Sequence, residues 1–152
     1  NDLQLNFIGD ISDSVKRAVL KNQLANNTRF INYVDHSKAI EYQRKSQVLL
    51  LLIPNIKKNK GILTGKLFEY LIAGRPIFAI GPEKGDLAQI LEDTDVGVVV
   101  DFENEEKQAS EILKLYDQYK NGNLEMSSKN IHKYHRKEIT KKLAFIINSL
   151  HS

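Results

Sequence analysis

The segment VLLLLIPNIKKNKGILTGKLFEYLIAGRPIFAIGP, residues 48–82, decides the fold class. It opens with six apolar residues, 48–53, and a run that is apolar on both faces is typical of a strand buried inside a parallel sheet. Residues 64–73 then place apolar side chains at helical spacing, and Gly74 follows at the position where a glycine commonly ends a helix. Residues 76–80 form another short apolar run. The segment therefore predicts a strand, a helix and a second strand, the unit from which parallel α/β sheets are built.

The same alternation continues on both sides of this segment. Further strands are predicted over residues 3–8, 28–34 and 97–100, and further helices over residues 13–25, 35–46 and 86–92. Strand and helix alternate about five times without a hairpin signal, an order typical of a doubly wound parallel α/β sheet, Rossmann-like, with right-handed crossovers. From residue 103 the pattern is helical almost to the end, with breaks near residues 121–123 and 135, so a helical C-terminal tail is expected.

Length and composition describe a single globular domain without disulfides. The chain has 152 residues, 41% of them hydrophobic, and a mean hydropathy of -0.37, values typical of one soluble domain. The chain has no cysteine, which excludes disulfides, thiolate metal ligands and thiol nucleophiles and is compatible with a cytoplasmic setting. The longest apolar run, residues 48–54, is far shorter than the roughly 20 residues of a membrane-spanning helix. Because the chain starts Asn-Asp-Leu-Gln and enters a strand pattern almost at once, we expect a piece of a longer protein.

Ligands of such sheets bind outside the carboxyl ends of the strands, and the loop after residue 53 is basic. Residues 41–66 carry six basic side chains against one acid, Glu41. A block of this kind fits either an anionic ligand or an ordinary solvated face, and the solvated face is the commoner case. The other loops at the same edge follow residues 8, 34, 80 and 100.

The helix after the basic loop carries two charged residues at its start, Lys66 and Glu69. On a helical wheel both lie opposite the broad apolar arc. Thr64 is the expected N-cap, and the free N–H groups of Gly65 to Leu67, together with the helix dipole, would form an anion site. Lys66 would add a full positive charge for a phosphate. Glu69, one turn further on, could accept two hydrogen bonds from a vicinal diol such as a ribose.

An ordinary surface ion pair is the alternative interpretation. Lys66 and Glu69 are three residues apart, and i,i+3 pairs are common on exposed helix faces, where they add roughly a few tenths of a kcal/mol. Spacing alone favours this alternative. The position of the two residues at the ligand edge, directly after the basic loop, favours a binding role.

A second candidate loop, residues 81–86, joins a strand to a helix. Gly85 permits close backbone approach and Asp86 stands in the first helical turn, so the amides of this loop are candidates for contact with a diphosphate or a sugar hydroxyl. A turn followed by an aspartate N-cap explains the same residues equally well.

Three familiar sites do not match the sequence. Only three residues separate Gly61 from Gly65 and Lys66, and Leu67 occupies the hydroxyl position of a P-loop. Gly9 lacks the later glycines of a dinucleotide fingerprint. The four histidines form no convincing ligand cluster, so no metal site is expected.

The stretch GKLFEYLIAGRPIFAIGPEKGDLAQILEDTDVGVVV, residues 65–100, resembles the carboxy-terminal half of GT-B glycosyltransferases, especially those of family 4. Outside this stretch the resemblance lies in the order of the elements, including an opening strand that ends in Gly9. The family has two Rossmann-like domains, and the second holds most of the nucleotide-sugar donor. The resemblance therefore implies that residues 1–135 form the nucleotide-sugar-binding domain. It implies also that residues 136–152 form a C-terminal helix that packs back toward a missing N-terminal domain.

The resemblance also assigns site residues. Glu69 matches the second glutamate of the family's paired-glutamate motif, which implies ribose binding, whereas the position of the first glutamate is occupied by Gly61. Lys66 matches a lysine that some branches place just before this helix, which implies contact with the diphosphate. The donor-binding residues expected on this basis are Gly9, Thr64, Gly65, Lys66, Leu67, Glu69, Gly85 and Asp86.

The implied full-length protein is a hexosyltransferase that moves a sugar from a nucleoside diphosphate to a glycan, a lipid or another acceptor. The acceptor site and the catalytic base would belong to the missing domain, so catalytic residues other than Lys66 stay unassigned and the fragment alone is expected to be inactive. The resemblance implies no cofactor and no essential metal, and we expect no nucleic-acid partner. A basic, amphipathic C-terminal helix leaves open a peripheral association with the inner face of a membrane, with core packing as the preferred interpretation.

Two other classes share this architecture. A sugar-nucleotide epimerase half-domain would show an acid and histidine constellation, which is not visible. A flavodoxin-like regulatory or binding module, such as a receiver, needs clustered acids after the first strand and a phosphoacceptor aspartate after the third. Asp10 is present, but the sequence Ile53-Pro54-Asn55 offers no such aspartate.

Overall fold

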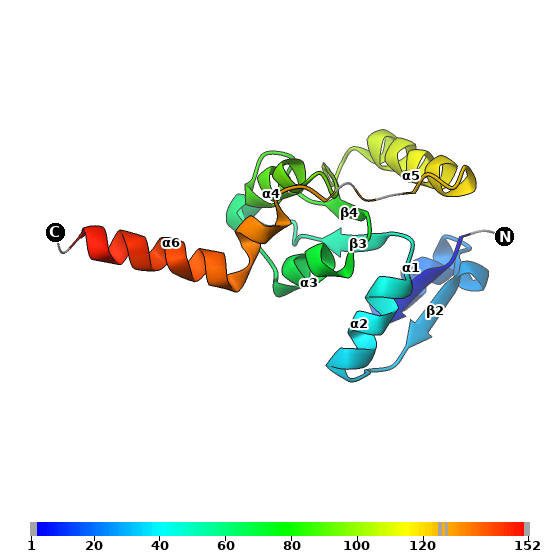
Figure 1. Ribbon diagram of the computed structural model, residues 1–152. Coiled ribbons are helices and arrows are strands. Elements are labelled where there is room, and N and C mark those ends of the chain that lie inside the picture. The colour runs from blue at the N-terminus through cyan, green and yellow to red at the C-terminus, as the bar shows by residue number, and fades with distance from the viewer. Residues whose placement is uncertain (1–2, 125, 127, 151–152) are drawn as a thin grey trace. The chain divides into compact units, whose positions relative to one another are not determined.

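The computed structural model describes residues 3–124, 126 and 128–150, and it has the predicted α/β architecture, with strands and helices alternating along the chain (Figure 1). The chain divides into two compact units, Asn1–Tyr42 and Gln43–Ser152. Each unit is built around its own parallel sheet. Residues 1–2, 125, 127 and 151–152 of the two expected segments, 1–135 and 136–152, lie outside the described residues.

The first unit is a β-α-β unit. Its elements are β1 (Leu5–Ile8), α1 (Asp13–Lys21), the 3-10 turn η1 (Ala25–Asn27), β2 (Thr28–Ile31) and most of α2 (His36–Lys45). β1 and β2 pair in parallel, with Leu5 opposite Thr28. The rings of Phe7 and Phe30, which are partners in this register, stack with their centroids 5.5 Å apart. Cross-strand aromatic pairs of this kind stabilise a sheet that would otherwise have only two strands.

The second unit contains a three-stranded parallel sheet in the order β3-β4-β5. Its elements are β3 (Leu49–Leu52), the 3-10 turn η2 (Asn59–Gly61), α3 (Gly65–Ala73), β4 (Ile77–Ile80), α4 (Asp86–Thr94), β5 (Gly97–Val100), α5 (Glu105–Lys120), the 3-10 turn η3 (Ile131–Tyr134) and α6 (Arg136–Ser149). Leu49 lies opposite Ile77, and Ile77 lies opposite Gly97. The predicted breaks after α5 and before α6 are confirmed, but the helix expected between them is not found: the described residues there form only the short turn η3.

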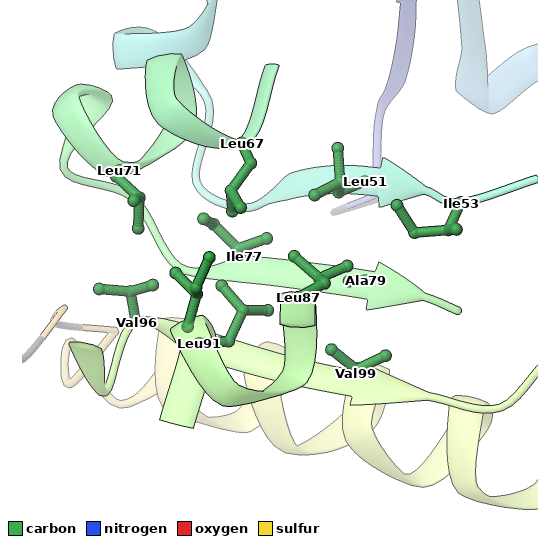
Figure 2. Packing of buried hydrophobic residues seen from close by; sticks show 11 residues of the cluster. Leu51, Ile53, Leu67, Leu71, Ile77, Ala79, Leu87, Leu91, Val96 and Val99 are labelled. Atoms are coloured by element: carbon green, nitrogen blue, oxygen red, sulfur yellow. The ribbon is translucent and has the colours of Figure 1, made fainter. Parts of the chain in front are cut away.

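The core of this unit lies between the sheet and helices α3 and α4. Figure 2 shows Leu67 and Leu71 of α3, and Leu87 and Leu91 of α4, gathered around Ile77 of β4. Leu67 is fully buried and Leu87 almost so, and burying a leucine side chain contributes about 1.5–3 kcal/mol. This packing fixes both helices, and with them the two helix N-termini at the carboxyl end of the sheet.

The more buried strand is β4 rather than β3. Phe78 and Ala79 of β4 are both buried, whereas Leu52 of β3 is 55% exposed. The expectation of a doubly buried strand at residues 48–53 is wrong at this position because β3 lies at the edge of its sheet and β4 lies in the centre. An apolar run shows that its residues favour burial. How far each residue is actually buried depends on the strands that lie beside it.

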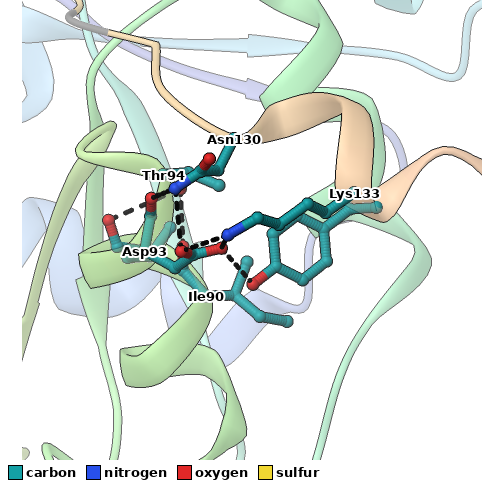
Figure 3. A network of polar contacts seen from close by, with 7 residues as sticks. Ile90, Asp93, Thr94, Asn130 and Lys133 are labelled. Carbon is teal, nitrogen blue, oxygen red and sulfur yellow. Dashed lines mark hydrogen bonds and ion pairs between the residues drawn. The ribbon is translucent and has the colours of Figure 1, made fainter.

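A polar cluster attaches the segment before α6 to the end of α4 (Figure 3). The Asp93 carboxylate accepts hydrogen bonds from Asn130 Nδ2 at 2.9 Å, Lys133 Nζ at 2.9 Å and the Tyr134 hydroxyl at 2.9 Å. The bond from the Lys133 ammonium, followed by that from the Tyr134 hydroxyl, lowers the pKa of Asp93 below its ordinary value. The cluster thus connects η3, and the start of α6, to the core through a charged group.

The lowered pKa of Asp93 predicts a pH-dependent effect of the substitution Asp93→Asn. Because the folded pKa lies below the unfolded one, ionised Asp93 stabilises the fold above the unfolded pKa, and this contribution is lost as the pH falls through the folded pKa. We expect Asp93→Asn to lower the melting temperature near neutral pH and to approach that of the wild type as the pH falls through the folded pKa of Asp93. The exposed Asp117 makes no such contacts among the described residues. The difference in melting temperature between Asp117→Asn and the wild type should therefore not change with pH in this way. A deficit in Asp93→Asn that is the same at every pH would contradict the prediction.

The surface of α6 is unusually apolar. Its exposed large hydrophobic residues are Ile139, Leu143, Phe145, Ile146 and Ile147, with Leu150 directly after the helix. No residue of α6 is buried. Among the described residues, no helix is long and apolar enough to cross a bilayer.

Candidate functional site

The start of α3 lies just beyond the carboxyl end of β3, where the sequence predicts the ligand edge. The connecting loop, residues 53–64, is ordered by backbone and amide contacts. Ile53 N–H donates to the Ile80 carbonyl at 2.9 Å and so extends the β3–β4 pairing by one residue, and Asn59 Nδ2 donates to the Pro54 carbonyl at 3.2 Å. The basic loop is therefore held by a backbone bond to β4 and by the side-chain amide of Asn59, and its lysine side chains are exposed.

Thr64 is the N-cap of α3, as predicted, but its hydroxyl does not cap the helix. The hydroxyl oxygen is buried and has no hydrogen-bond partner among the described residues. The Leu67 N–H donates to the Thr64 carbonyl at 3.1 Å. Among the described residues, the amides of Gly65 and Lys66 remain free for a ligand. The anion site therefore has two free amides and not the three expected from the sequence.

Lys66 and Glu69 do not form the surface ion pair that their spacing allows. No ion pair joins these two described residues, and the Lys66 side chain is exposed. Glu69 is half-buried, and its Oε2 accepts a hydrogen bond from Gln43 Nε2 at 3.0 Å. The structure thus contradicts the ion-pair interpretation, and it leaves the Lys66 ammonium available for an anionic group.

Gln43 is a site residue that the sequence did not reveal. It lies in the last turns of α2 and is 26 residues from Glu69 along the chain, so no local spacing rule connects the two. The end of α2 is held in place because Arg75 Nε donates to the Arg44 carbonyl at 2.7 Å. The only sequence signal that could have suggested a role is a polar residue inside an amphipathic helix, which is a weak signal.

Tyr70, the neighbour of Glu69, attaches α3 to the sheet. Its hydroxyl lies 3.5 Å from the Leu50 carbonyl, as a donor. Burial raises the pKa of Tyr70, and the nearby Glu69 charge raises it further. The hydroxyl therefore stays protonated at neutral pH and keeps its role as a donor to β3.

Gly85 and Asp86 lie at the start of α4, against the loop that precedes α3. Gly85 is the N-cap in an extended conformation, so Asp86 is the first helical residue and not the cap. A Cβ at position 85 would lie 2.5 Å from the Lys60 carbonyl oxygen. The close backbone approach expected at Gly85 is thus made by the protein's own η2. A Cβ on Gly61 would lie 3.8 Å from Asp86 Oδ2, so the Asp86 carboxylate stands beside position 61.

The remainder of loop 81–86 is tied to the start of α5. Glu83 Oε1 accepts hydrogen bonds from Lys107 Nζ at 3.0 Å and from the Asp101 N–H at 3.4 Å. The bond from Lys107 contributes most to lowering the pKa of Glu83 below its ordinary value. The Gly81 N–H donates to the Val100 carbonyl at 3.0 Å. The loop is a structured turn, and Asp86 is the exposed acid at its end.

Gly9 belongs to the first unit. It has a φ of +108°, which glycine adopts without strain, and its N–H donates to the Ile31 carbonyl at 2.9 Å. It lines a small cavity of about 150 Å³ at the carboxyl ends of β1 and β2. The other lining residues are Asp10, Ile11, Lys16, Phe30, Ile31 and Asn32. The Lys16 ammonium is paired with the Asp13 carboxylate at 3.6 Å.

Metal ligands do not gather in the described part of the chain. Among these residues no group of three or more His, Asp or Glu is placed to hold a metal ion. His36 begins α2, and His132 and His135 lie in and directly after η3. His151 lies outside the described residues.

Comparison with known proteins identifies the fold. No family model matches the chain, and no curated protein matches its sequence. A solved structure, sucrose-phosphate synthase from Thermosynechococcus elongatus, is similar, with a TM-score of 0.63 and 15% sequence identity over 97% of this chain. The chain spans 37% of the length of that protein. At this identity the likeness concerns the fold, and the resemblance to family 4 in particular stays a prediction. The chain has the α/β fold of a GT-B-type, Rossmann-like half-domain, as the sequence predicts.

Proposed function

We propose that the chain is the donor-binding domain of a glycosyltransferase, and that it holds a nucleoside diphosphate sugar at the start of α3. The observation that carries the proposal is the arrangement of Lys66 and Glu69. The Lys66 ammonium, which has no partner among the described residues, stands in the first helical turn, and an oriented carboxylate follows one turn later at the carboxyl edge of a parallel sheet. Such edges are the usual ligand sites of open α/β sheets.

Each group has a distinct role in the proposed site. The Lys66 ammonium and the amides of Gly65 and Lys66 bind the diphosphate, where the positive end of the helix dipole favours negative charge. The Glu69 carboxylate accepts hydrogen bonds from the ribose hydroxyls. Asp86, the first residue of α4, is the proposed contact to the donor from the second loop. When the sugar leaves, the same positive groups stabilise the charge that develops on the diphosphate.

The complete enzyme in this proposal has a preceding domain that supplies the acceptor site and the base. Its reaction is the transfer of a hexose to a glycan, a lipid or another acceptor, and positioning of the two substrates supplies much of the rate. No cofactor or metal takes part. The proposal is supported by the shared fold with sucrose-phosphate synthase, of which this chain spans 37%.

The role proposed for α6 is to pack against that preceding domain. Its exposed apolar residues Ile139, Leu143, Ile146 and Leu150 recur at helical spacing, and a helix face of this kind normally has a partner. Amide hydrogen exchange in α6 should slow when the preceding domain is present. Unchanged exchange, or binding of the chain to anionic lipid vesicles, would favour the membrane alternative.

The direct test is the effect of Lys66→Gln on nucleotide binding. We expect this change to weaken binding of uridine or guanosine diphosphate by about tenfold, because a charge-assisted contact to a phosphate contributes about 1.5 kcal/mol or more. Binding of the corresponding nucleoside should not change. Amide chemical shifts around residues 64–70 and 81–87 report the position of the ligand, and titration calorimetry gives the affinity. The matched control is Lys137→Gln, an exposed lysine of α6.

Two results would contradict the proposal. One is the absence of any amide shift at millimolar nucleotide. The other is an equal loss of affinity in Lys66→Gln and Lys137→Gln, since this would indicate a diffuse charge effect rather than a site.

A further inference from the structure

Gln43 and Glu69 form a contact between two separate helices of the second unit. Gln43 Nε2 donates to Glu69 Oε2 at 3.0 Å, and both side chains are half-buried. No other described residue makes a hydrogen bond or an ion pair with Glu69. One carboxylate oxygen is therefore held by the protein, and Oε1 is left for a ligand.

The charge of Glu69 fixes the orientation of the Gln43 amide. Gln43 Oε1 is buried and has no partner among the described residues. No contact on the Oε1 side of the amide therefore determines which way the amide group is turned. The reversed amide would place its oxygen against the carboxylate, two acceptors without a proton between them. The amide thus presents its N–H to Glu69, and a donor to an ionised oxygen makes a strong hydrogen bond.

Both ends of the contact lie on elements that are held in place. α3 is fixed by the buried side chains of Leu67 and Leu71, and the end of α2 is fixed by the bond from Arg75 to the Arg44 carbonyl. Because neither helix end is free to follow a moving side chain, the contact restricts the rotamer of Glu69. A carboxylate must keep one orientation to accept two hydrogen bonds from neighbouring hydroxyls.

We propose that Gln43 is the positioning residue that sets Glu69 to select a ribose over a 2′-deoxyribose. The proposal rests on the proposed function, in which Glu69 binds the ribose. Gln43 holds Oε2, so Oε1 and the second lone pair of Oε2 keep the geometry that two adjacent hydroxyls require. Without Gln43 the carboxylate turns among its rotamers and still attracts one hydroxyl, but the second bond is lost.

The test compares ribonucleotides with 2′-deoxyribonucleotides on the 152-residue chain. Affinities of uridine and guanosine diphosphates and of their 2′-deoxy forms are measured by titration calorimetry. Gln43→Met keeps the length of the side chain and removes the donor. We expect this substitution to reduce the preference for the ribonucleotide, the ratio of its affinity to that of the 2′-deoxy form, about fivefold. The matched control is Gln89→Met on the exposed face of α4, which should leave the preference unchanged.

A double substitution separates positioning from packing. In a Glu69→Ala background, the further change Gln43→Met should not alter the preference, because Gln43 acts only through the Glu69 side chain. An additional loss there would overturn the proposal. So would a Gln43→Met protein that keeps the full preference, or one that loses affinity for both nucleotides equally.

Different results would refute the ribose role of Glu69 and the positioning role of Gln43. A wild-type chain that binds ribonucleotide and 2′-deoxyribonucleotide equally well would refute the ribose role of Glu69, and with it the role of Gln43. A wild-type chain with a clear preference that survives Gln43→Met would leave the proposed function standing and refute the role of Gln43 alone.

Discussion

Replacing Glu69 with alanine is expected to weaken the binding of nucleoside diphosphates by about 10- to 100-fold, because hydrogen bonds to a charged group contribute about 1.5–3 kcal/mol. The carboxylate is half-buried and, within the described part of the chain, accepts one hydrogen bond, from Gln43. In the proposed site its remaining acceptor positions bind the ribose. The loss should therefore be largest for the ribonucleotide and small for the 2′-deoxy form, as measured by titration calorimetry of both.

The matched control for this change is Glu92→Ala. Glu92 is an exposed glutamate of α4, so this substitution removes the same charge without touching the site. Glu69→Gln keeps the shape of the side chain and removes its charge, and it should fall between the wild type and Glu69→Ala. If Glu69→Ala and Glu92→Ala bind both nucleotides equally well, then Glu69 does not bind the ribose.

The order of strands and helices could be predicted because each element carries its own signals. The helix predicted over residues 64–73 is found as α3, Gly65–Ala73. Its start follows a threonine, and Gly74 ends it with a φ of +71°. Apolar spacing, a cap residue and a terminal glycine all lie within the segment itself, so a single sequence is enough to find it.

The degree of burial could not be predicted in the same way, because it depends on neighbours in space. Residues 49–52 and 77–80 are both apolar runs. Ile77 and Ala79 are almost completely buried, while Leu52 is largely exposed. The difference follows from the order β3-β4-β5, which gives β4 a partner on each side. Nothing in either run specifies that order.

The candidate site shows the same limit. The spacing of Lys66 and Glu69 suggested that they pair with each other, whereas Glu69 accepts a hydrogen bond from Gln43, and Lys66 has no partner among the described residues. A contact across 26 residues depends on how two helices pack, and local spacing rules do not reach that far. At Gly85 the sequence indicated a close approach, but the approaching group is the Lys60 carbonyl. The glycine at position 85 correctly indicated that a backbone group approaches closely. Which group approaches depends on the fold.

Gly97→Ala is expected to destabilise the second unit by about 2–3 kcal/mol, the cost of forcing atoms into a filled space. Gly97 is the first residue of β5 and lies opposite Ile77 of β4. A Cβ there would lie 1.9 Å from the Ile77 carbonyl oxygen and 2.8 Å from its carbonyl carbon. Both are backbone atoms of the central strand, so no side chain can turn away to make room. Urea unfolding of the wild type and of Gly97→Ala measures the loss in free energy of unfolding, provided that this free energy depends equally steeply on urea concentration in the two proteins.

The backbone around Gly97 cannot shift cheaply, because it is fixed on both sides. The Ile77 N–H donates to the Val96 carbonyl at 2.8 Å, and the turn before β5 is closed at Asp95, whose φ is +54°. The matched control is Gly65→Ala, since a Cβ at position 65 would meet nothing within 4 Å, and its effect should stay within about 0.5 kcal/mol. If both alanine variants unfold at the wild-type urea midpoint, β4 and β5 do not approach this closely at Ile77. If only Gly97→Ala is destabilised, close strand approach explains why β5 begins with a glycine.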